Sequence, residues 1–299
     1  MQELNLQDIL AQTQDLSEEK KVWYVAIIGR PNAGKSTFIN SLIGEKISIT
    51  TDVPQTTRKR VLAIYNDEDS QIIFFDTPGI HKSEKVFNKK INDVALGTFK
   101  DCELILYFID ATREGGEEEK YIRQMVDMVN KPVLKVYTKS DLPARISVPK
   151  GENTLSISSV SKDGFSELLA KTKSYLATGP LFFPNDIYTK QDMFFRVSEI
   201  IREKAFMYTK EELPHSLYIG VEEIVDEEKL LKLVAYIYTE TDSQKYIIIG
   251  KGGTLIEKIG KEARIELEEI FEKKVFLALR VKVKKNWRKD DRLTKKILQ

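Results

Sequence analysis

Short apolar runs alternate with helix-period segments through the first part of the chain. The apolar runs cover residues 22–28, 72–75, 104–109, 133–137 and 154–157, and the helical stretches cover 35–43, 117–129 and 165–177. Continuous apolar strands separated by helices are typical of a parallel sheet that is covered on both faces. Because crossovers between parallel strands are right-handed, we expect a doubly wound α/β domain.

The pattern changes after Tyr188. A helix-period segment at 193–206 precedes strand-like runs at 217–224 and 230–238, a glycine-containing turn, a glutamate-rich helix and a last strand at 275–283. Helices and antiparallel strands in this order fit a smaller α+β domain. Glycine and proline residues interrupt the pattern between the two parts. We therefore predict an N-terminal extension at 1–20, a first domain at 21–178, a linker at 179–188 and a second domain at 189–299.

The composition narrows the class of protein. A length of 299 residues is enough for two domains, and the single cysteine, Cys102, cannot form an intramolecular disulfide. The sequence does not open on a basic stretch followed by an apolar run, and its apolar runs are far shorter than the roughly 20 residues that span a bilayer. We therefore expect a cytoplasmic protein that is neither secreted nor membrane-spanning.

The net charge of +1 conceals an uneven distribution. Residues 273–299 hold eleven lysines or arginines and two aspartates, so the rest of the chain is acidic. A basic tail on an acidic body is typical of proteins that contact an anionic polymer or a membrane surface. A solvated tail without a partner is the alternative, and charge alone does not separate the two.

A phosphate-binding pattern, G-x-x-x-x-G-K-[ST], lies where the first strand ends and the first helix begins. It is formed by Gly29, Arg30, Pro31, Asn32, Ala33, Gly34, Lys35, Ser36 and Thr37. Such a turn points backbone N–H groups at phosphates, and the helix N-terminus adds positive potential. We expect Lys35 to reach the β- and γ-phosphates and Ser36 to bind Mg²⁺. An ordinary glycine turn is the alternative interpretation.

A second motif, Asp76, Thr77, Pro78 and Gly79, closes the apolar run at 72–75. An aspartate at the end of a buried strand opposite the phosphate loop is expected to support Mg²⁺ indirectly, through the groups that bind the ion. Gly79 would let its N–H approach the γ-phosphate closely. Alone this sequence is a common turn; its spacing from the first motif makes the metal site the better interpretation.

Two further loops follow buried strands and match guanine-reading motifs. Thr138, Lys139, Ser140 and Asp141 are similar to the N-K-x-D motif, in which the aspartate accepts hydrogen bonds that adenine cannot supply. Ser158, Ser159 and Val160 match a loop whose backbone N–H contacts the guanine oxygen. The stem of Lys139 would lie on the base.

The order of these motifs resembles the translation-factor-related GTPases, and the RPN and QTTR variants resemble the bacterial Era family. The resemblance implies a P-loop GTPase domain followed by a C-terminal KH domain. It implies that the first switch is formed by Gln55, Thr56, Thr57 and Arg58, with Thr57 closing on Mg²⁺ and the γ-phosphate. Two residues depart from the family pattern: Thr138 stands where asparagine is usual, and Ser159 stands where alanine is usual.

Ile80 occupies the position where Ras-like enzymes have a water-positioning glutamine. An isoleucine cannot orient water, so intrinsic hydrolysis should be slow. In related GTPases with this substitution, an asparagine at the position of Asn32 can hold K⁺. The resemblance therefore implies K⁺ as a second cation beside Mg²⁺, with catalytic roles for Lys35, Thr57 and Asn32. A turn-capping role for Asn32 is the alternative.

The glycine turn of the second domain fits the G-x-x-G of a KH domain and is formed by Gly250, Lys251, Gly252 and Gly253. Glycines let phosphates approach the backbone, and Lys251 adds charge. Residues 246–249 favour a strand by propensity, but the KH assignment makes them helix. We expect the basic strand and tail to extend the RNA surface through Lys282, Lys284, Trp287 and Arg288, with Trp287 stacking on a base. A packed tryptophan is the alternative.

Together these features indicate a GTP-hydrolysing switch in which the nucleotide controls RNA binding by the second domain. The resemblance implies the 3′ end of 16S rRNA and the 30S subunit as partners, with peripheral contact with the inner membrane also attributed to the family. We expect a monomer. The rival interpretations are a P-loop phosphotransferase, which would have no need to read guanine, and an RNA-binding scaffold with a vestigial nucleotide site.

Overall fold

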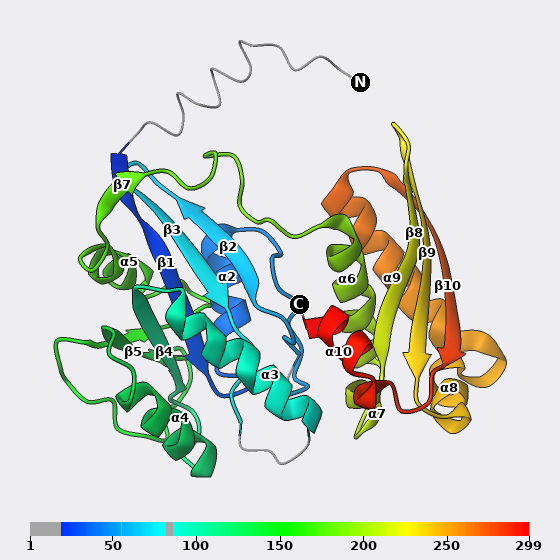
Figure 1. The fold of residues 1–299 in the computed structure, drawn as a ribbon, viewed down its shortest axis with the longest axis horizontal. Helices are drawn as coiled ribbons and strands as arrows, with labels where there is room; N and C mark the ends of the chain where they lie inside the picture. The colour runs from blue at the N-terminus through cyan, green and yellow to red at the C-terminus, as the bar shows by residue number, and fades with distance from the viewer. Residues whose placement is uncertain (1–18, 55, 82–85, 299) are drawn as a thin grey trace. The chain divides into compact units, whose positions relative to one another are not determined.

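The computed structural model describes residues 19–54, 56–81 and 86–298. The chain forms two compact units (Figure 1). The described part of the first unit runs to Ser48 and continues from Thr57 to Lys190, and the second unit comprises Ile49–Thr56 and Gln191–Ile297. Most of the predicted N-terminal extension, together with Gln55 of the predicted first switch, lies outside the described residues.

A seven-stranded sheet forms the centre of the first unit. Its strands are β1 (Glu19–Gly29), β2 (Val61–Asn66), β3 (Ser70–Asp76), β4 (Leu104–Asp110), β5 (Val133–Thr138), β6 (Thr154–Ile157) and β7 (Thr178–Pro180). The order is β2-β3-β1-β4-β5-β6, and the short β7 pairs antiparallel with the start of β1. Only β2 and β7 run against the other strands. The carboxyl ends of β1, β3, β4 and β5 therefore meet at one edge.

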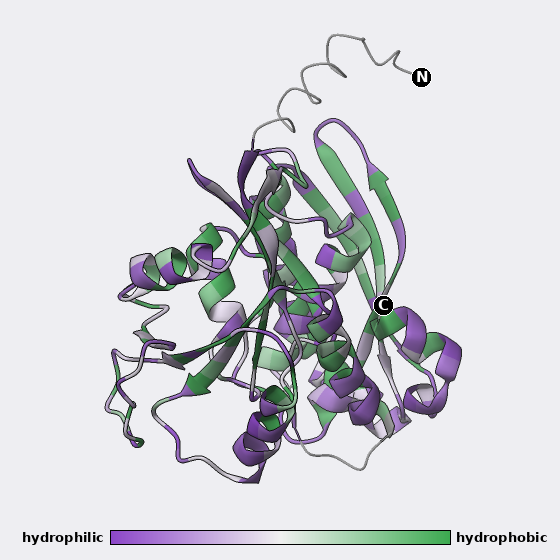
Figure 2. Cartoon of the chain, turned by 60° about the vertical axis from the view of Figure 1, so that its left-hand side comes forward, coloured by the Kyte–Doolittle hydropathy of each residue, from purple (hydrophilic) through white to green (hydrophobic). Residues whose placement is uncertain are grey.

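Helices cover both faces of this sheet. They are α2 (Lys35–Ile43), α3 (Val86–Gly97), α4 (Glu117–Asp127) and α5 (Phe165–Lys173), with a 3₁₀ turn at Thr98–Lys100. Phe38 of α2 packs edge-on against Phe108 and against Phe165 of α5 on one face. Residues from α3 and α4 join a core cluster on the other face. Figure 2 shows the consequence, with apolar strands inside and polar residues on the helices.

The segment at 179–188, predicted as a linker, packs against the first unit. Leu181 and Phe183 are buried in a cluster with residues of β1, β2 and β3. The Gln71 side chain accepts hydrogen bonds from the backbone N–H groups of residues 182 and 183 at 2.9 and 3.0 Å. Because these contacts hold the segment on the sheet, the first unit extends to Lys190.

The second unit has the element order of a type II KH domain. Its elements are α6 (Met193–Met207), α7 (Leu213–Ser216), β8 (Tyr218–Asp226), β9 (Leu230–Thr239), α8 (Asp242–Ile249), α9 (Thr254–Phe271), β10 (Lys274–Val283), a 3₁₀ turn at Trp287–Lys289 and α10 (Asp291–Leu298). The sheet order is β10-β9-β8, with β10 parallel to β9. Residues 246–249 are helical, as the KH assignment required.

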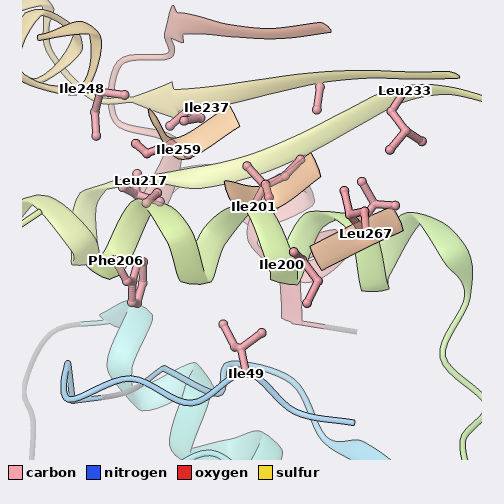
Figure 3. Close-up of a cluster of buried hydrophobic side chains, with 14 of the residues drawn as sticks. Ile49, Ile200, Ile201, Phe206, Leu217, Leu233, Ile237, Ile248, Ile259 and Leu267 are labelled. Carbon is pink, nitrogen blue, oxygen red and sulfur yellow. The ribbon is translucent and has the colours of Figure 1, made fainter. Parts of the chain in front are cut away.

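One apolar cluster holds the second unit together. Ile201 of α6 points toward the strands, Ile200 extends from the other side of the helix, and both belong to one cluster with Leu267 of α9 and Leu233 of β9 (Figure 3). The capping box at Thr241 starts α8 by satisfying two backbone N–H groups. Among the described residues, no helix is long and apolar enough to cross a membrane.

Residues 49–54 and Thr56 belong to the second unit. Ile49 is 4% exposed and lies in the same cluster as α6, where Figure 3 shows it beneath the helix. The backbone N–H of Thr50 donates to Glu203 Oε1 at 2.9 Å. The chain therefore passes into the second unit at Ile49 and returns to the first unit at Thr57.

Candidate active site and nucleic-acid interface

The phosphate loop runs from the end of β1 into α2. The Lys35 ammonium is buried and donates to the carbonyl oxygens of Arg30 and Gly29 at 2.9 and 3.2 Å. Burial lowers the pKa of Lys35 to about 8, although the charges of Asp76 and Glu119 oppose that shift. The phosphate loop therefore holds the ammonium in place. On nucleotide binding, the ammonium would leave these carbonyl oxygens and contact the phosphates.

Three oxygen-bearing side chains meet beside the start of α2. Ser36 Oγ donates to Asp76 Oδ2 at 2.6 Å and lies 3.1 Å from Thr57 Oγ1. Burial raises the pKa of Asp76, against the hydrogen bond from Ser36 and the charge of Lys35. Asp76 Oδ1 is buried without a hydrogen-bond partner among the described residues. Two hydroxyls and a buried carboxylate with a spare oxygen fit Mg²⁺, which prefers hard oxygen donors.

The loop after β3 approaches the phosphate loop closely. A Cβ at Gly79 would lie 2.6 Å from the backbone nitrogen of Pro31, so only glycine fits there. The N–H of Ile80 donates to the carbonyl oxygen of Gly29 at 3.1 Å, and the Ile80 side chain is fully buried in the core. Ile80 therefore has no part in orienting water. Thr77 Oγ1 is also buried and donates to the carbonyl oxygen of Ile27 at 2.6 Å.

The predicted base-reading residues follow β5. Thr138 Oγ1 donates to the carbonyl oxygen of Ala33 at 2.9 Å and thus ties this loop to the phosphate loop. Lys139 has a φ of 63° and its ammonium lies 2.7 Å from Asp110 Oδ2. Asp141 is exposed, so its carboxylate is accessible to a base.

The loop after β6 is fixed to the loop after β5. The N–H of Ser140 donates to the carbonyl oxygen of Ile157 at 3.1 Å. The buried Ser158 Oγ accepts hydrogen bonds from the N–H groups of Val160 and Ser161 at 3.2 and 3.1 Å. These bonds leave Ser159 in the middle of the turn that our prediction places against the guanine oxygen.

The first-switch residues divide between the two units. Thr56 is buried and its Oγ1 donates to the carbonyl oxygen of Val53 at 2.6 Å, whereas Thr57 reaches Ser36. Arg58 is buried and its guanidinium carbon lies 5.7 Å from the centre of the Phe87 ring. Asn32 has a φ of 61°, the left-handed conformation that asparagine tolerates.

The G-x-x-G turn of the second unit joins α8 to α9. Lys251 and Gly252 are exposed, and Gly252 has a φ of 63°. Just before the turn, Tyr246 and Ile247 are 71% and 56% exposed, although both are large apolar side chains. An exposed apolar pair beside a glycine turn and a lysine can contact a base and the phosphate next to it.

Trp287 does not have the predicted role. It is fully buried, donates from Nε1 to the carbonyl oxygen of Ser216 at 2.8 Å, and packs 4.9 Å from the Tyr218 ring. The prediction that Trp287 stacks on a base is wrong, because the ring anchors the tail to the start of β8. Lys282 and Arg288 form ion pairs with Glu222 and Glu240, respectively, whereas Lys284 is exposed.

Sequence reasoning missed two carboxylates near the nucleotide loops. Asp110 pairs with Lys139, and Glu119 forms an ion pair with Arg30. Asp110 ends the parallel strand β4, and the carboxyl ends of such strands form the ligand crevice of doubly wound sheets. That position was a usable signal. Glu119 gave no such signal in the sequence, because a glutamate in the first turn of a helix is usually explained by its favourable interaction with the helix dipole.

Both units match families of known proteins. Residues 24–139 match the model of a 50S ribosome-binding GTPase, and residues 212–288 match the model of a KH domain. With the fold and the loops described above, the chain is a P-loop GTPase that carries a C-terminal KH domain. It is 43% identical to the GTPase Era of Treponema denticola, over 91% of this chain and 98% of that protein. It is 42% identical to the GTPase Era of Thermotoga petrophila, over 91% and 94%. The chain belongs to the Era family of GTPases.

Two solved structures also support the assignment of this chain to the Era family. Era in complex with MgGDPNP and nucleotides 1506–1542 of 16S ribosomal RNA has a TM-score of 0.87 and 35% identity, over 92% of this chain and 98% of that chain. Aquifex aeolicus Era Y63A bound to GDP.AlF4⁻ has a TM-score of 0.85 and 34% identity, with the same coverage. The predicted fold class, family and GTPase activity are confirmed.

Proposed function

We propose that this GTPase binds the 3′ end of 16S rRNA through the Gly250–Gly253 turn and thereby assists maturation of the small ribosomal subunit. The main observation that supports this proposal is the exposed turn, which contains Lys251 and is preceded by the exposed side chains of Tyr246 and Ile247. The related Era structure that contains a 16S fragment supports the choice of RNA. A single strand is the expected ligand, because an A-form duplex hides the base edges.

The nucleotide state controls this binding in our proposal. Residues 49–54 and Thr56 belong to the second unit, and Thr57 Oγ1 lies 3.1 Å from Ser36 Oγ in the metal site. Ordering of Thr57 around Mg²⁺ and the γ-phosphate therefore acts on a segment that the second unit also holds. Glu203, which is 3% exposed, accepts the N–H of Thr50 and so gives this segment a buried polar contact with α6.

Within the nucleotide site we assign roles from the geometry. Lys35 neutralises the β- and γ-phosphates, Ser36 and Thr57 bind Mg²⁺ with Asp76 behind them, and Asp141 selects guanine. By the family resemblance, and not from a contact in the structure, Asn32 would hold K⁺, which would supply positive charge where other GTPases use an arginine. Turnover that is equal in K⁺ and Na⁺ buffers would remove the K⁺ role and leave the GTPase activity unaffected.

The proposal is tested by measuring the affinity of the full chain for a labelled 16S 3′-end oligonucleotide. A scrambled strand and a duplex of the same length are the controls, each with GDP and with a non-hydrolysable GTP analogue. We expect tight binding of the single strand only, and a difference in affinity between the two nucleotides. Equal binding of the scrambled strand would refute the choice of 16S RNA.

The control by nucleotide has its own test. Glu203→Ala removes the acceptor of the Thr50 N–H, whereas Glu203→Gln keeps one. We expect the alanine variant to bind the oligonucleotide with nearly the same affinity in both nucleotide states, and the glutamine variant to behave like the wild type. A full nucleotide effect in the alanine variant would contradict this coupling.

The cellular setting is also part of the proposal. We propose a cytoplasmic monomer that engages the 30S subunit and contacts the inner membrane peripherally through its basic tail. Sedimentation of the chain with 30S particles, and separately with anionic vesicles at increasing salt, tests both contacts. Recovery with neither would refute them.

A further inference from the structure

Arg30 of the phosphate loop is buried against a helix that sequence motifs do not connect with nucleotide binding. The side chains of Arg30 and Glu119 are 5% and 6% exposed, and Arg30 Nε lies 2.7 Å from Glu119 Oε2. Arg30 Nη1 also donates to the carbonyl oxygen of Glu114 at 3.3 Å. The guanidinium is thus bound to the first turn of α4 and to the loop before it.

A third residue holds the carboxylate in place. The hydroxyl of Tyr107, a fully buried residue of β4, donates to Glu119 Oε1 and lies 3.4 Å from the Glu119 carbonyl oxygen. The Glu119 carboxylate therefore has one oxygen on Tyr107 and the other on Arg30. Because Tyr107 belongs to the central sheet, the ion pair has a fixed position relative to the strands around the phosphate loop.

The backbone of Arg30 is part of the cradle for the catalytic lysine. The Lys35 ammonium donates to the carbonyl oxygens of Arg30 and Gly29. Fixing the Arg30 side chain therefore fixes the direction of the carbonyl that holds the ammonium before nucleotide binds. We propose that Arg30, Glu119 and Tyr107 are positioning residues, which set the path of the phosphate loop and so the position of Lys35 relative to the β-phosphate.

A buried ion pair can often be replaced as a whole without loss of stability, so the effect of this pair on the phosphate loop can be tested apart from folding. Removing one partner leaves an uncompensated charge and destabilises a protein strongly, whereas replacing both by apolar residues of similar volume is often neutral. The double variant Arg30→Met with Glu119→Leu is therefore the informative one. Tyr107→Phe removes only the hydroxyl that orients the carboxylate.

The experiment measures release of fluorescent GDP from the full chain, GTP turnover, competition by GMP, and the thermal midpoint. We expect the double variant to unfold within a few degrees of the wild type, to release GDP about tenfold faster and to turn over more slowly. Affinity for GMP, which has no β-phosphate for Lys35, should change much less. The control is Glu266→Gln, which alters a largely enclosed but less buried ion pair with Lys204 in the second unit and should leave GDP release unchanged.

Wild-type GDP release and turnover in a folded double variant would overturn the proposal, as would equal losses for GDP and GMP. If the double variant does not fold, Tyr107→Phe decides. We expect it to release GDP about threefold faster and to unfold no more than a few degrees below the wild type, since a single hydrogen bond to the carboxylate is lost. Unchanged GDP release in Tyr107→Phe would overturn the proposal in the same way.

Discussion

Thr138 donates a 2.9 Å hydrogen bond from its hydroxyl to the carbonyl oxygen of Ala33 and so joins the base-reading loop to the phosphate loop. The family pattern to which this loop is similar has asparagine at this position, and that residue is expected to tie the same two loops together. The shorter threonine makes the contact here with its side chain fully enclosed. The departure from the family pattern therefore keeps the connection and changes only the group that makes it.

Removing the Thr138 hydroxyl should loosen the nucleotide site. Thr138→Val keeps the shape but leaves the Ala33 carbonyl without its donor, at a cost of about 1 kcal/mol. We expect GDP to dissociate about fivefold faster, with guanine specificity unchanged. Thr138→Asn restores the usual residue and should bind GDP at least as tightly as the wild type. Stopped-flow release of labelled GDP compares the three proteins, and identical rates would show that the tie is not functional.

Base specificity should depend on Asp141. Asp141→Asn presents an amide donor in place of a carboxylate, which suits xanthine and not guanine. Each hydrogen bond to a charged group contributes about 1.5–3 kcal/mol, so GTP affinity should fall at least about tenfold while XTP affinity rises. Competition of GTP, XTP and ATP against a labelled nucleotide measures the change. Equal competition by GTP and ATP in the wild type would contradict the guanine assignment.

Hydrolysis should require Mg²⁺ and depend on the charge of Asp76. Asp76→Asn keeps an acceptor for the Ser36 hydroxyl but removes the carboxylate behind the metal. Changes of this kind usually weaken metal affinity by about 10–100-fold. We therefore expect half-maximal turnover at a correspondingly higher Mg²⁺ concentration, and none in EDTA. A Mg²⁺ titration that coincides with the wild type would exclude Asp76 from the site.

RNA binding should be lost without loss of GTP hydrolysis when Lys251 and Gly252 are both changed to aspartate. Gly252 has open space around its Cβ position and a φ that aspartate tolerates, so the turn should persist. Gly250 is unsuitable for this test, because a Cβ there would lie 2.8 Å from the Leu255 side chain. Oligonucleotide affinity and GTP turnover are measured on the same preparation. Undiminished binding would mean that the basic tail alone binds RNA.

One surface ion pair predicts how stability responds to acid. Burial alone would raise the pKa of Asp67, but hydrogen bonds from Lys173 and Ser70 lower it to about 2, below its ordinary 3.8. A carboxylate with a lowered pKa stabilises the folded state above about pH 4, and this contribution disappears as the pH falls toward 2. Because the pair is partly exposed, we expect about 1 kcal/mol at most.

The comparison of Asp67→Asn with the wild type isolates this contribution. Urea unfolding at pH 6 should show the variant as less stable, and the difference should shrink at pH 3. A difference that is constant between the two pH values would assign the effect to the hydrogen bond with Ser70 and not to the charge.

Much of the fold could be predicted because its signals are local. The helix at 35–43 has the predicted bounds, since the phosphate-loop pattern fixes its start and Gly44, with a φ of 83°, ends it. The strand β2 was missed because it lies outside the parallel series, where it pairs antiparallel at the sheet edge. Helix α3 was missed because the polar run NKKIND interrupts its apolar spacing.

The site residues that could be predicted from the sequence are those that belong to recognisable motifs. The residue types and the spacing of Ser36 and Asp76 are enough by themselves to indicate a metal site. The packing of Trp287 was not predictable, because its acceptor, the Ser216 carbonyl, lies 71 residues away in the sequence. The Arg30–Glu119 pair was hidden for the same reason, since its partners are brought together only by the sheet.

Because the chain enters the second unit at Ile49 and returns to the first unit at Thr57, the two units cannot be separated by a single cut without loss of contacts. A shortened chain that ended near Lys190 would leave Ile49 facing water and would release Thr50 from its acceptor. GTP turnover of such a fragment would then be measured with Thr57 no longer held in place by the residues before it. The separated second unit would lack Ile49, which is part of its core. Genetic or biochemical dissection into halves would thus alter both activities at once, and only substitutions in the intact chain can assign an effect to one of them.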